Sequence, residues 1–148
     1  MDKQMLQSLV KAVVCALQEE TKKKDGMNKV IDKSGVLMVE MSTVKPEPFD
    51  TGKPGDRVFL KDIVTLEESP RIGAGLMEMF ETTFDWTLHY DEFDYIIDGE
   101  LSIIVDGNTI TGKKGDVIHI PKDTSIQFSV PNYAKFMYFT YPADWEQA

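Results

Sequence analysis

Residues 92–101 read EFDYIIDGEL, and residues 115–122 read GDVIHIPK. In each stretch alternate residues would face opposite sides of a sheet, because successive side chains of a β-strand point to opposite faces. Gly99 and Gly115 stand where the chain has to turn, and glycine tolerates the backbone conformations that tight turns require. Together the two stretches predict strands that curve around a common interior and send every second side chain inward.

Further strand-like segments surround these two stretches at close intervals. Gly, Pro and Asp residues separate them, and Asp106-Gly107-Asn108 is typical of a tight hairpin turn. The predicted strands cover residues 35–41, 58–66, 72–80, 86–90, 93–97, 101–105, 108–111, 117–120, 126–130 and 136–141. Many short strands in succession favour an all-β sandwich or barrel over a parallel sheet with crossover helices.

A different pattern, with the period of a helix, occupies residues 1–24. Apolar side chains recur there at steps of three and four residues, at Leu6, Leu9, Val10, Val13 and Leu17. An amphipathic helix is barely stable in isolation, so this face is expected to pack on the barrel or on a second copy, or to dock on another protein. The sequence therefore predicts a helix over 1–24, a linker over 25–34 and a β-barrel over 35–148.

The composition limits the possible partners and compartments. The chain has 148 residues and a formal net charge of −9, which argues against nucleic acid and against an anionic membrane surface, because both would repel it. Its single cysteine, Cys15, has no partner for an internal disulfide and is typical of a reducing compartment. No apolar run approaches the length of a membrane span, so a cytoplasmic location is expected.

The two stretches quoted first resemble the paired motifs of the cupin superfamily. Glu92 stands seven residues before Gly99, as a glutamate does in the first cupin motif, and residues 115–122 resemble the opening of the second. This resemblance implies an all-β fold, a cupin-like (RmlC-like) small β-barrel or jelly roll, preceded by the N-terminal amphipathic helix.

The same resemblance bears on metal binding, because a metal-binding cupin has three histidines beside its glutamate. The matching positions hold other residues here, Asp85 and Thr87 or Trp86 and Leu88, and later Ile126. Transition metals want about three or four protein ligands, so no transition metal is expected at Glu92.

Several segments also resemble the EutQ family, the cupin-fold proteins of bacterial ethanolamine utilisation. The likeness rests on residues 84–92, 98–101, 115–117, 120–122 and 141–145. It implies acetate kinase activity, which forms acetate and ATP from acetyl phosphate and ADP, with Mg²⁺ as a cofactor. Longer members of the family carry a larger N-terminal region, so this chain resembles a short version. The alternative is a non-catalytic protein that binds a small-molecule ligand or organises a microcompartment, with a degenerate cupin metal site.

The EutQ resemblance further implies a location and partners. It places the chain in a bacterial microcompartment within the cytoplasm. Residues 1–24 resemble the short amphipathic helices that dock cargo on microcompartment shells, so shell or cargo proteins are expected partners. Cupin-like barrels commonly pair through exposed sheet edges, so a homodimer is expected as well.

The candidate site residues gather around Glu92. On a strand Glu92 and Asp94 point the same way, and two carboxylates so close in a barrel should shift each other's pKa and suit acid–base catalysis or Mg²⁺ binding. Alternatively both are solvated residues at the rim. Tyr90 is a third candidate for catalysis, and Trp86 a candidate for substrate binding. His89 is a second candidate for substrate binding, or else a surface imidazole on the outer face.

Overall fold

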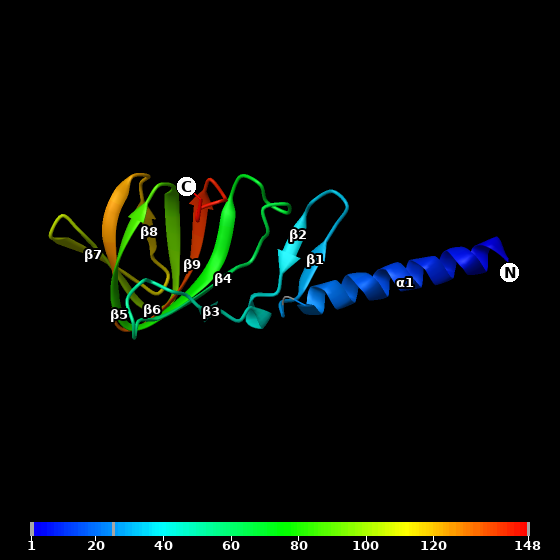
Figure 1. The fold of residues 1–148 in the computed structure, drawn as a ribbon, viewed down its shortest axis with the longest axis horizontal. Helices are drawn as coiled ribbons and strands as arrows, with labels where there is room; N and C mark the ends of the chain where they lie inside the picture. The colour runs from blue at the N-terminus through cyan, green and yellow to red at the C-terminus, as the bar shows by residue number, and fades with distance from the viewer. Residues whose placement is uncertain (1, 25, 148) are drawn as a thin grey trace. The chain divides into compact units, whose positions relative to one another are not determined.

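The computed structural model describes the backbone of residues 2–24 and 26–147, and the side chains of residues 2–15 and 26–147. The chain divides into two compact units, Met1–Lys45 and Pro46–Ala148, and each is described by itself (Figure 1). Among the described residues no helix combines the length and the apolar character that crossing a membrane requires.

The N-terminal unit consists of a helix and a small hairpin. Helix α1 spans Lys3–Lys24, which confirms the predicted helix. Its described stripe residues Leu6, Leu9, Val10 and Val13 are each about half exposed, while the side chain of Leu17 lies outside the described part. Strands β1 (Lys29–Ile31) and β2 (Leu37–Val39) pair antiparallel, and a short 3-10 helix, η1, follows at Met41–Thr43.

The hairpin corrects the predicted linker over 25–34, of which Asp25 lies outside the described residues. Residues 29–31 form a strand because a tight turn brings them against β2. The carboxylate of Asp32 accepts a hydrogen bond from the backbone N–H of Ser34 at 2.8 Å, and Gly35 adopts a φ of +94°. Short polar side chains and glycine favour such turns, so this segment belongs to the first unit.

The C-terminal unit is an antiparallel sheet rolled around an apolar core. Its strand order is β3-β4-β5-β9-β6-β7, and β8 also pairs with β6. The strands are β3 (Glu47–Pro48), β4 (Arg57–Asp62), β5 (Gly73–Leu88), β6 (Asp91–Val105), β7 (Asn108–Lys113), β8 (Val117–Ile120) and β9 (Thr124–Tyr141). The hydrogen-bonded ladder of the described strands does not close on itself, so the predicted barrel is an open, strongly curved sheet.

Three of these strands are longer than predicted, because β5, β6 and β9 each join two predicted strands. The predicted breaks are bulges, which bend a strand without ending it. In β5 the register shifts at Glu81, whose φ is +43°, and in β6 it shifts on both sides of Gly99. Gly99 has a φ of +73°, and a Cβ there would lie 2.0 Å from the carbonyl oxygen of Tyr133, so only glycine lets β9 approach this closely.

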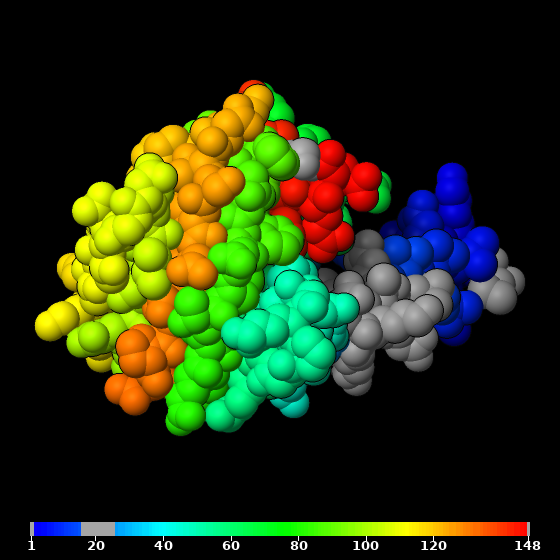
Figure 2. All heavy atoms as spheres, turned by 60° about the vertical axis from the view of Figure 1, so that its left-hand side comes forward, coloured from blue at the N-terminus to red at the C-terminus, as the bar shows by residue number. Residues whose placement is uncertain are grey.

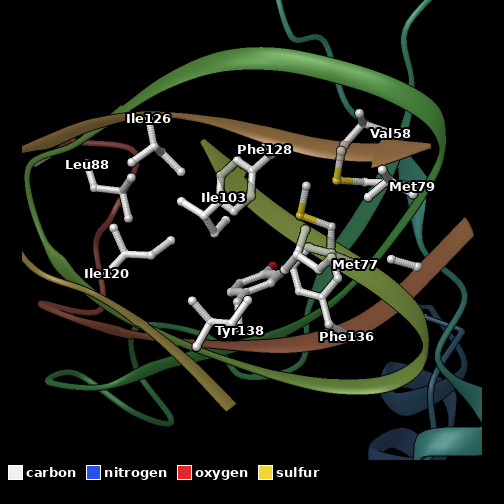
Figure 3. Packing of buried hydrophobic residues seen from close by; sticks show 14 of the residues in the cluster. Val58, Met77, Met79, Leu88, Ile103, Ile120, Ile126, Phe128, Phe136 and Tyr138 are labelled. Carbon is white, nitrogen blue, oxygen red and sulfur yellow. The ribbon is translucent and has the colours of Figure 1, made fainter. Parts of the chain in front are cut away.

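The core lies inside the curve of the sheet. Figure 3 shows side chains from β4, β5, β6, β8 and β9 meeting between the bent strands. The labelled members are Val58, Met77, Met79, Leu88, Ile103, Ile120, Ile126, Phe128, Phe136 and Tyr138. After β9 the chain continues into a short C-terminal segment that lies beside the start of β5, where a Cβ on Gly73 would contact Ala143. Figure 2 shows this segment in red next to the green surface around β5.

Candidate functional site

A small cavity of about 30 Å³ adjoins the apolar core. It is lined by Phe49, Leu60, Met77, Phe84, Trp86, Tyr90, Glu92, Phe128, Tyr138 and Trp145. Seven of these ten residues are aromatic. Of the described residues in this lining, Glu92 alone has a carboxyl group, and none is a lysine, arginine or histidine.

The start of β6 carries acidic side chains into the interior. Glu92 and Asp94 expose 5% and 0% of their surface, whereas Phe93 between them is half exposed. Glu92 lies opposite Thr140 of β9, and Asp94 lies opposite Tyr138. Because paired residues share a face of the sheet, the two carboxyl groups, the threonine hydroxyl and the tyrosine ring all project inward.

The polar atoms of this group are buried without ordinary partners. Glu92 Oε2, both carboxyl oxygens of Asp94 and Thr140 Oγ1 find no hydrogen-bond partner within the described chain. Burial raises the pKa of Glu92 to about 7, and burial followed by the charge of Glu92 raises the pKa of Asp94 well above its ordinary value. Both shifts favour the protonated forms, and a protonated carboxyl of this pair can donate a hydrogen bond to the other.

Aromatic side chains form the wall next to Glu92. The indole N–H of Trp86 donates to the hydroxyl oxygen of Tyr90 at 2.8 Å, and Tyr90 is 3% exposed. Burial, and then the charge of Glu92, raise the pKa of Tyr90 above its ordinary value, so this phenol stays neutral at physiological pH. Trp145 lies at the centre of the wall, with its ring centroid 6.2 Å from those of Phe49, Trp86, Tyr90 and Tyr138.

A second hydrogen-bonded group fixes Tyr138 and Trp145. The hydroxyl of Tyr138 donates to Asp62 Oδ1 at 2.6 Å, and the indole N–H of Trp145 donates to the same oxygen at 3.3 Å. Gly75 pairs with Asp62 on one side and with Tyr138 on the other. A Cβ on Gly75 would lie 2.0 Å from the Tyr138 ring, so the missing side chain lets that ring cross β5 to reach Asp62.

Four of the five predicted site residues come together here. Trp86, Tyr90 and Glu92 line the cavity, and Asp94 lies behind Glu92 on the same inner face. Their catalytic and binding roles stay predictions, but the alternative that the carboxylates are solvated at the rim is wrong, because both are buried. His89 lies apart from the cavity, with 56% of its side chain exposed and Nδ1 3.3 Å from Asp123 Oδ1. This position agrees with the surface imidazole that was the alternative.

Other site residues were not recognisable as such from the sequence. Thr140 and Tyr138 are two apart on β9 and share a face, but the register that sets them opposite Glu92 and Asp94 cannot be read from either strand alone. Trp145 lies beyond the last strand, and only the fold of the terminal segment brings it into the wall. Asp62 gave no such signal, because the predicted strand over 58–66 places it inside the strand, whereas β4 ends at this residue.

Comparison with known proteins places these features in a family. The family model described as ethanolamine utilisation protein EutQ matches residues 1–147. A curated protein from Clostridioides difficile (strain 630), named acetate kinase EutQ, is 50% identical over 147 residues, which are 97% of this chain and 94% of that protein. The protein of the same name from Salmonella typhimurium is 40% identical over 117 residues, which are 79% of this chain but 51% of the relative.

Solved structures show the same likeness in three dimensions. The structure of the Clostridium difficile EutQ protein superposes with a TM-score of 0.79 and 55% identity, covering 81% of this chain and 90% of that one. An RmlC-like cupin from Shewanella frigidimarina superposes with a TM-score of 0.58 at 12% identity, covering 83% of this chain and 99% of that one. The second likeness concerns the fold alone, and it confirms the predicted cupin-like architecture.

Proposed function

Because this chain belongs to the EutQ family of ethanolamine utilisation proteins, we propose that it has the acetate kinase activity stated in the names of its curated relatives. In this reaction an oxygen of the terminal phosphate of ADP attacks the phosphorus of acetyl phosphate. The bond from phosphorus to the acetyl oxygen breaks, and acetate leaves with the electron pair. The main support is 50% identity to the clostridial protein over nearly the whole chain, whereas the chain spans about half of the enterobacterial relative.

The observation that connects this activity with the structure is the buried carboxyl of Glu92 in an aromatic cavity. The rings suit the methyl group of an acetyl unit and exclude water from it. A protonated Glu92 can donate a hydrogen bond to an acetyl oxygen, which stabilises the charge that develops as acetate leaves. The phosphoryl groups would stay outside the cavity, because its described lining offers no cationic side chain.

The residues present do not fit a protein-bound Mg²⁺ ion in this cavity. Magnesium demands six oxygen ligands in near-ideal octahedral geometry and keeps several waters. Within the described part of the chain no three acidic, histidine or cysteine side chains gather at one point. Beyond Glu92 the cavity wall is made of rings, a leucine and a methionine, so the Glu92–Asp94 pair has no further oxygen ligands there except the hydroxyls of Tyr90 and Tyr138.

The test is ATP formation from acetyl phosphate and ADP by the purified full chain. Glu92→Gln keeps the side-chain volume but removes the protonable group, and the rate is expected to fall about a hundredfold. Glu100→Gln is the matched control, because Glu100 is on the same strand but exposed and 3.8 Å from Lys113, and it should keep the wild-type rate. Equal trace rates for wild type and Glu92→Gln would contradict the proposal.

A second candidate function is ligand binding without catalysis. It is favoured by the composition of the described cavity lining, which has no lysine, arginine or histidine to neutralise a phosphate. Phosphoryl transfer usually relies on such charges. If ATP formation fails while the cavity still binds a small molecule, this second function replaces the first.

For the N-terminal helix we propose a docking role in a bacterial microcompartment, with shell or cargo proteins as partners. Helix α1 supports this because its apolar residues Leu6, Leu9, Val10 and Val13 are exposed along one stripe. Changing Leu9 and Val13 to serine should leave the thermal unfolding of the C-terminal unit unchanged. The same variant should abolish co-sedimentation with assembled shells, and retention of co-sedimentation would contradict the proposal.

For the expected homodimer we propose the outer face of β8, β6 and β9 as the interface. Exposed apolar side chains gather on these neighbouring strands, at Phe93, Tyr95, Val117, Phe139 and Tyr141. A contiguous apolar patch of this kind commonly marks a protein interface. Light scattering after size-exclusion chromatography should give a dimer for wild type and a monomer for Phe93→Glu. A wild-type monomer would contradict this assignment.

A further inference from the structure

We propose that the cavity around Glu92 is a binding site for a small organic ammonium ion. The site combines three features, which are aromatic walls, a buried carboxyl with one oxygen that has no partner among the described residues, and the lack of any cationic group in the described lining. This inference goes beyond acetate kinase activity and stands independently of it.

The walls provide the aromatic surface that ammonium ions recognise. Cations are attracted to the electron-rich faces of aromatic rings, most strongly to tryptophan, and a cation enclosed by several rings is a recurring arrangement. Here Trp145 has four aromatic neighbours at a centroid distance of 6.2 Å, and Trp86 has Phe49 at 5.7 Å and Phe84 at 6.3 Å. Both tryptophans of the chain line the cavity.

The charge of the site also favours a cation. Glu92 is 5% exposed, it lines the cavity, and its Oε2 has no hydrogen-bond partner among the described residues. An ionised carboxyl buried in this way is unfavourable unless an opposite charge or a donor reaches it. Asp94 lies behind Glu92, outside the lining, and the pair can share one proton. When Glu92 is ionised, the site thus offers a negative charge to a bound cation.

Three of the four hydrogen-bond donors in the described lining are already in use, which leaves only the hydroxyl of Tyr90 and argues against an anionic ligand deep in the cavity. The indole N–H of Trp86 donates a hydrogen bond to Tyr90, and the indole N–H of Trp145 donates one to Asp62. The hydroxyl of Tyr138 also goes to Asp62. A carboxylate or phosphate would therefore meet mostly ring carbons, and the ionised form of Glu92 would repel it. An ammonium group brings the donors that Glu92 lacks.

Binding should depend on pH, because a cation and a proton compete for Glu92. The titratable groups that face it are Asp94 on the same strand, Tyr90 just before β6, and Tyr138 on β9, whose hydroxyl is held by Asp62. Burial raises the pKa values of Glu92 and Asp94, so the pair loses negative charge as the pH falls below neutrality. Affinity for an ammonium ion should rise between pH 6 and pH 8.

The experiment titrates the full chain with ethanolamine, a primary ammonium ion at neutral pH, and follows tryptophan fluorescence at constant ionic strength. Ethylene glycol is the matched neutral probe, because it replaces the ammonium group by a hydroxyl. We expect a saturable fluorescence change with ethanolamine at pH 8, and binding of ethylene glycol weaker by about tenfold or more. Equal affinities for the two probes, or no saturable change with ethanolamine, would overturn the proposal.

Variants then locate the binding. Glu92→Gln should weaken ethanolamine binding by about tenfold or more, and Glu100→Gln should leave it unchanged. Circular dichroism establishes that both variants are folded. If Glu92→Gln does not fold, the wild-type affinities at pH 6 and pH 8 take its place, and equal affinities there contradict the site. The titration contains no nucleotide or acetyl phosphate, so its result is independent of whether ATP formation is observed.

Discussion

The two halves of β6, on either side of Gly99, bury different kinds of side chain. In the second half Leu101 and Ile103 are buried, and Ser102 between them hydrogen-bonds Thr111 on the outer side at 2.7 Å. In the first half Asp94 is fully buried and Phe93 is half exposed. The bulge around Gly99 separates the halves. Before it the even-numbered residues face inward, and after it the odd-numbered residues face inward.

In the second half apolar side chains are buried and a polar one faces outward, as hydrophobic burial alone would produce. The first half buries carboxyl groups, whose transfer from water is costly, and exposes aromatic rings, whose burial would be favourable. Departures of this kind from the ordinary pattern are expected where function requires them. The comparison therefore separates residues that stabilise the fold, such as Leu101, from Glu92 and Asp94, which reduce its stability near neutral pH.

The largest expected effect is in the ordinary half. Leu101→Ala removes a fully buried side chain and leaves a cavity in the core, so the free energy of unfolding should fall by about 3 kcal/mol. Urea denaturation at equilibrium measures this change. Ser102→Ala, on the outer side of the same strand, should stay within about 0.5 kcal/mol of wild type. Similar losses for both variants would show that the two faces of this half are not distinct.

A somewhat smaller loss is expected where β5 makes room for the aromatic wall. The added methyl group of Gly75→Ala overlaps the Tyr138 ring, so the ring must move away from Asp62, at a cost of about 2 kcal/mol. Tyr138→Phe keeps the ring and removes only its hydrogen bond, which should cost about 1 kcal/mol. Thermal unfolding compares the two variants. A greater loss for Tyr138→Phe than for Gly75→Ala would contradict the crossing of the ring over Gly75.

The sequence predicts much of this architecture, because the period-two pattern and the glycines are local signals. Residues 117–120 are predicted as a strand and form β8 with the same bounds, and Glu92 and Asp94 share a face as expected. The continuity of β6 is not a local property. Gly99 can serve a turn or a bulge equally well, and the close approach of the Tyr133 carbonyl decides between them.

The predictable part of the site is likewise the part that lies within one segment. Trp86 near the end of β5, Tyr90 in the turn that follows and Glu92 at the start of β6 are close in sequence, and this short stretch of chain is enough to bring them together. Phe49 and Trp145 reach the same cavity from the two ends of the C-terminal unit. Their contribution depends on how distant segments pack, which no periodicity in the sequence expresses.

In the first half of β6 the expected contribution of the buried carboxyl groups to folding stability depends on pH. Glu92 and Asp94 have raised pKa values, so the folded chain binds their protons more tightly than the unfolded chain does. Stability is therefore greatest below the ordinary pKa of these groups and falls as the pH rises toward about 7, the raised pKa of Glu92. Asp94→Asn removes one ionising group, and its stability relative to wild type should be about 1 to 2 kcal/mol more favourable at pH 8 than at pH 5.

Urea denaturation at the two pH values measures this difference, with Glu100→Gln as the control for loss of an exposed acidic group on the same strand. The control should follow the wild-type dependence on pH. If the unfolding free energy of Asp94→Asn changes with pH as that of wild type does, then the buried pair does not titrate as the structure indicates.

The smallest effect on the folded monomer is expected at Phe93, between the two carboxyl groups. Its ring is half exposed and stacks on His119 at a centroid distance of 4.5 Å. Phe93→Ser should change the unfolding free energy of the monomer by no more than about 0.5 kcal/mol, since surface substitutions rarely do more.

If the outer face is a dimer interface, the melting temperature of wild type rises with protein concentration and that of Phe93→Ser does not. Melting curves at low and high concentration separate the two contributions. A large loss of unfolding free energy for Phe93→Ser in dilute solution would mean that the exposed ring stabilises the monomer. The exposed residues in the first half of β6 would then contribute to stability, contrary to the comparison.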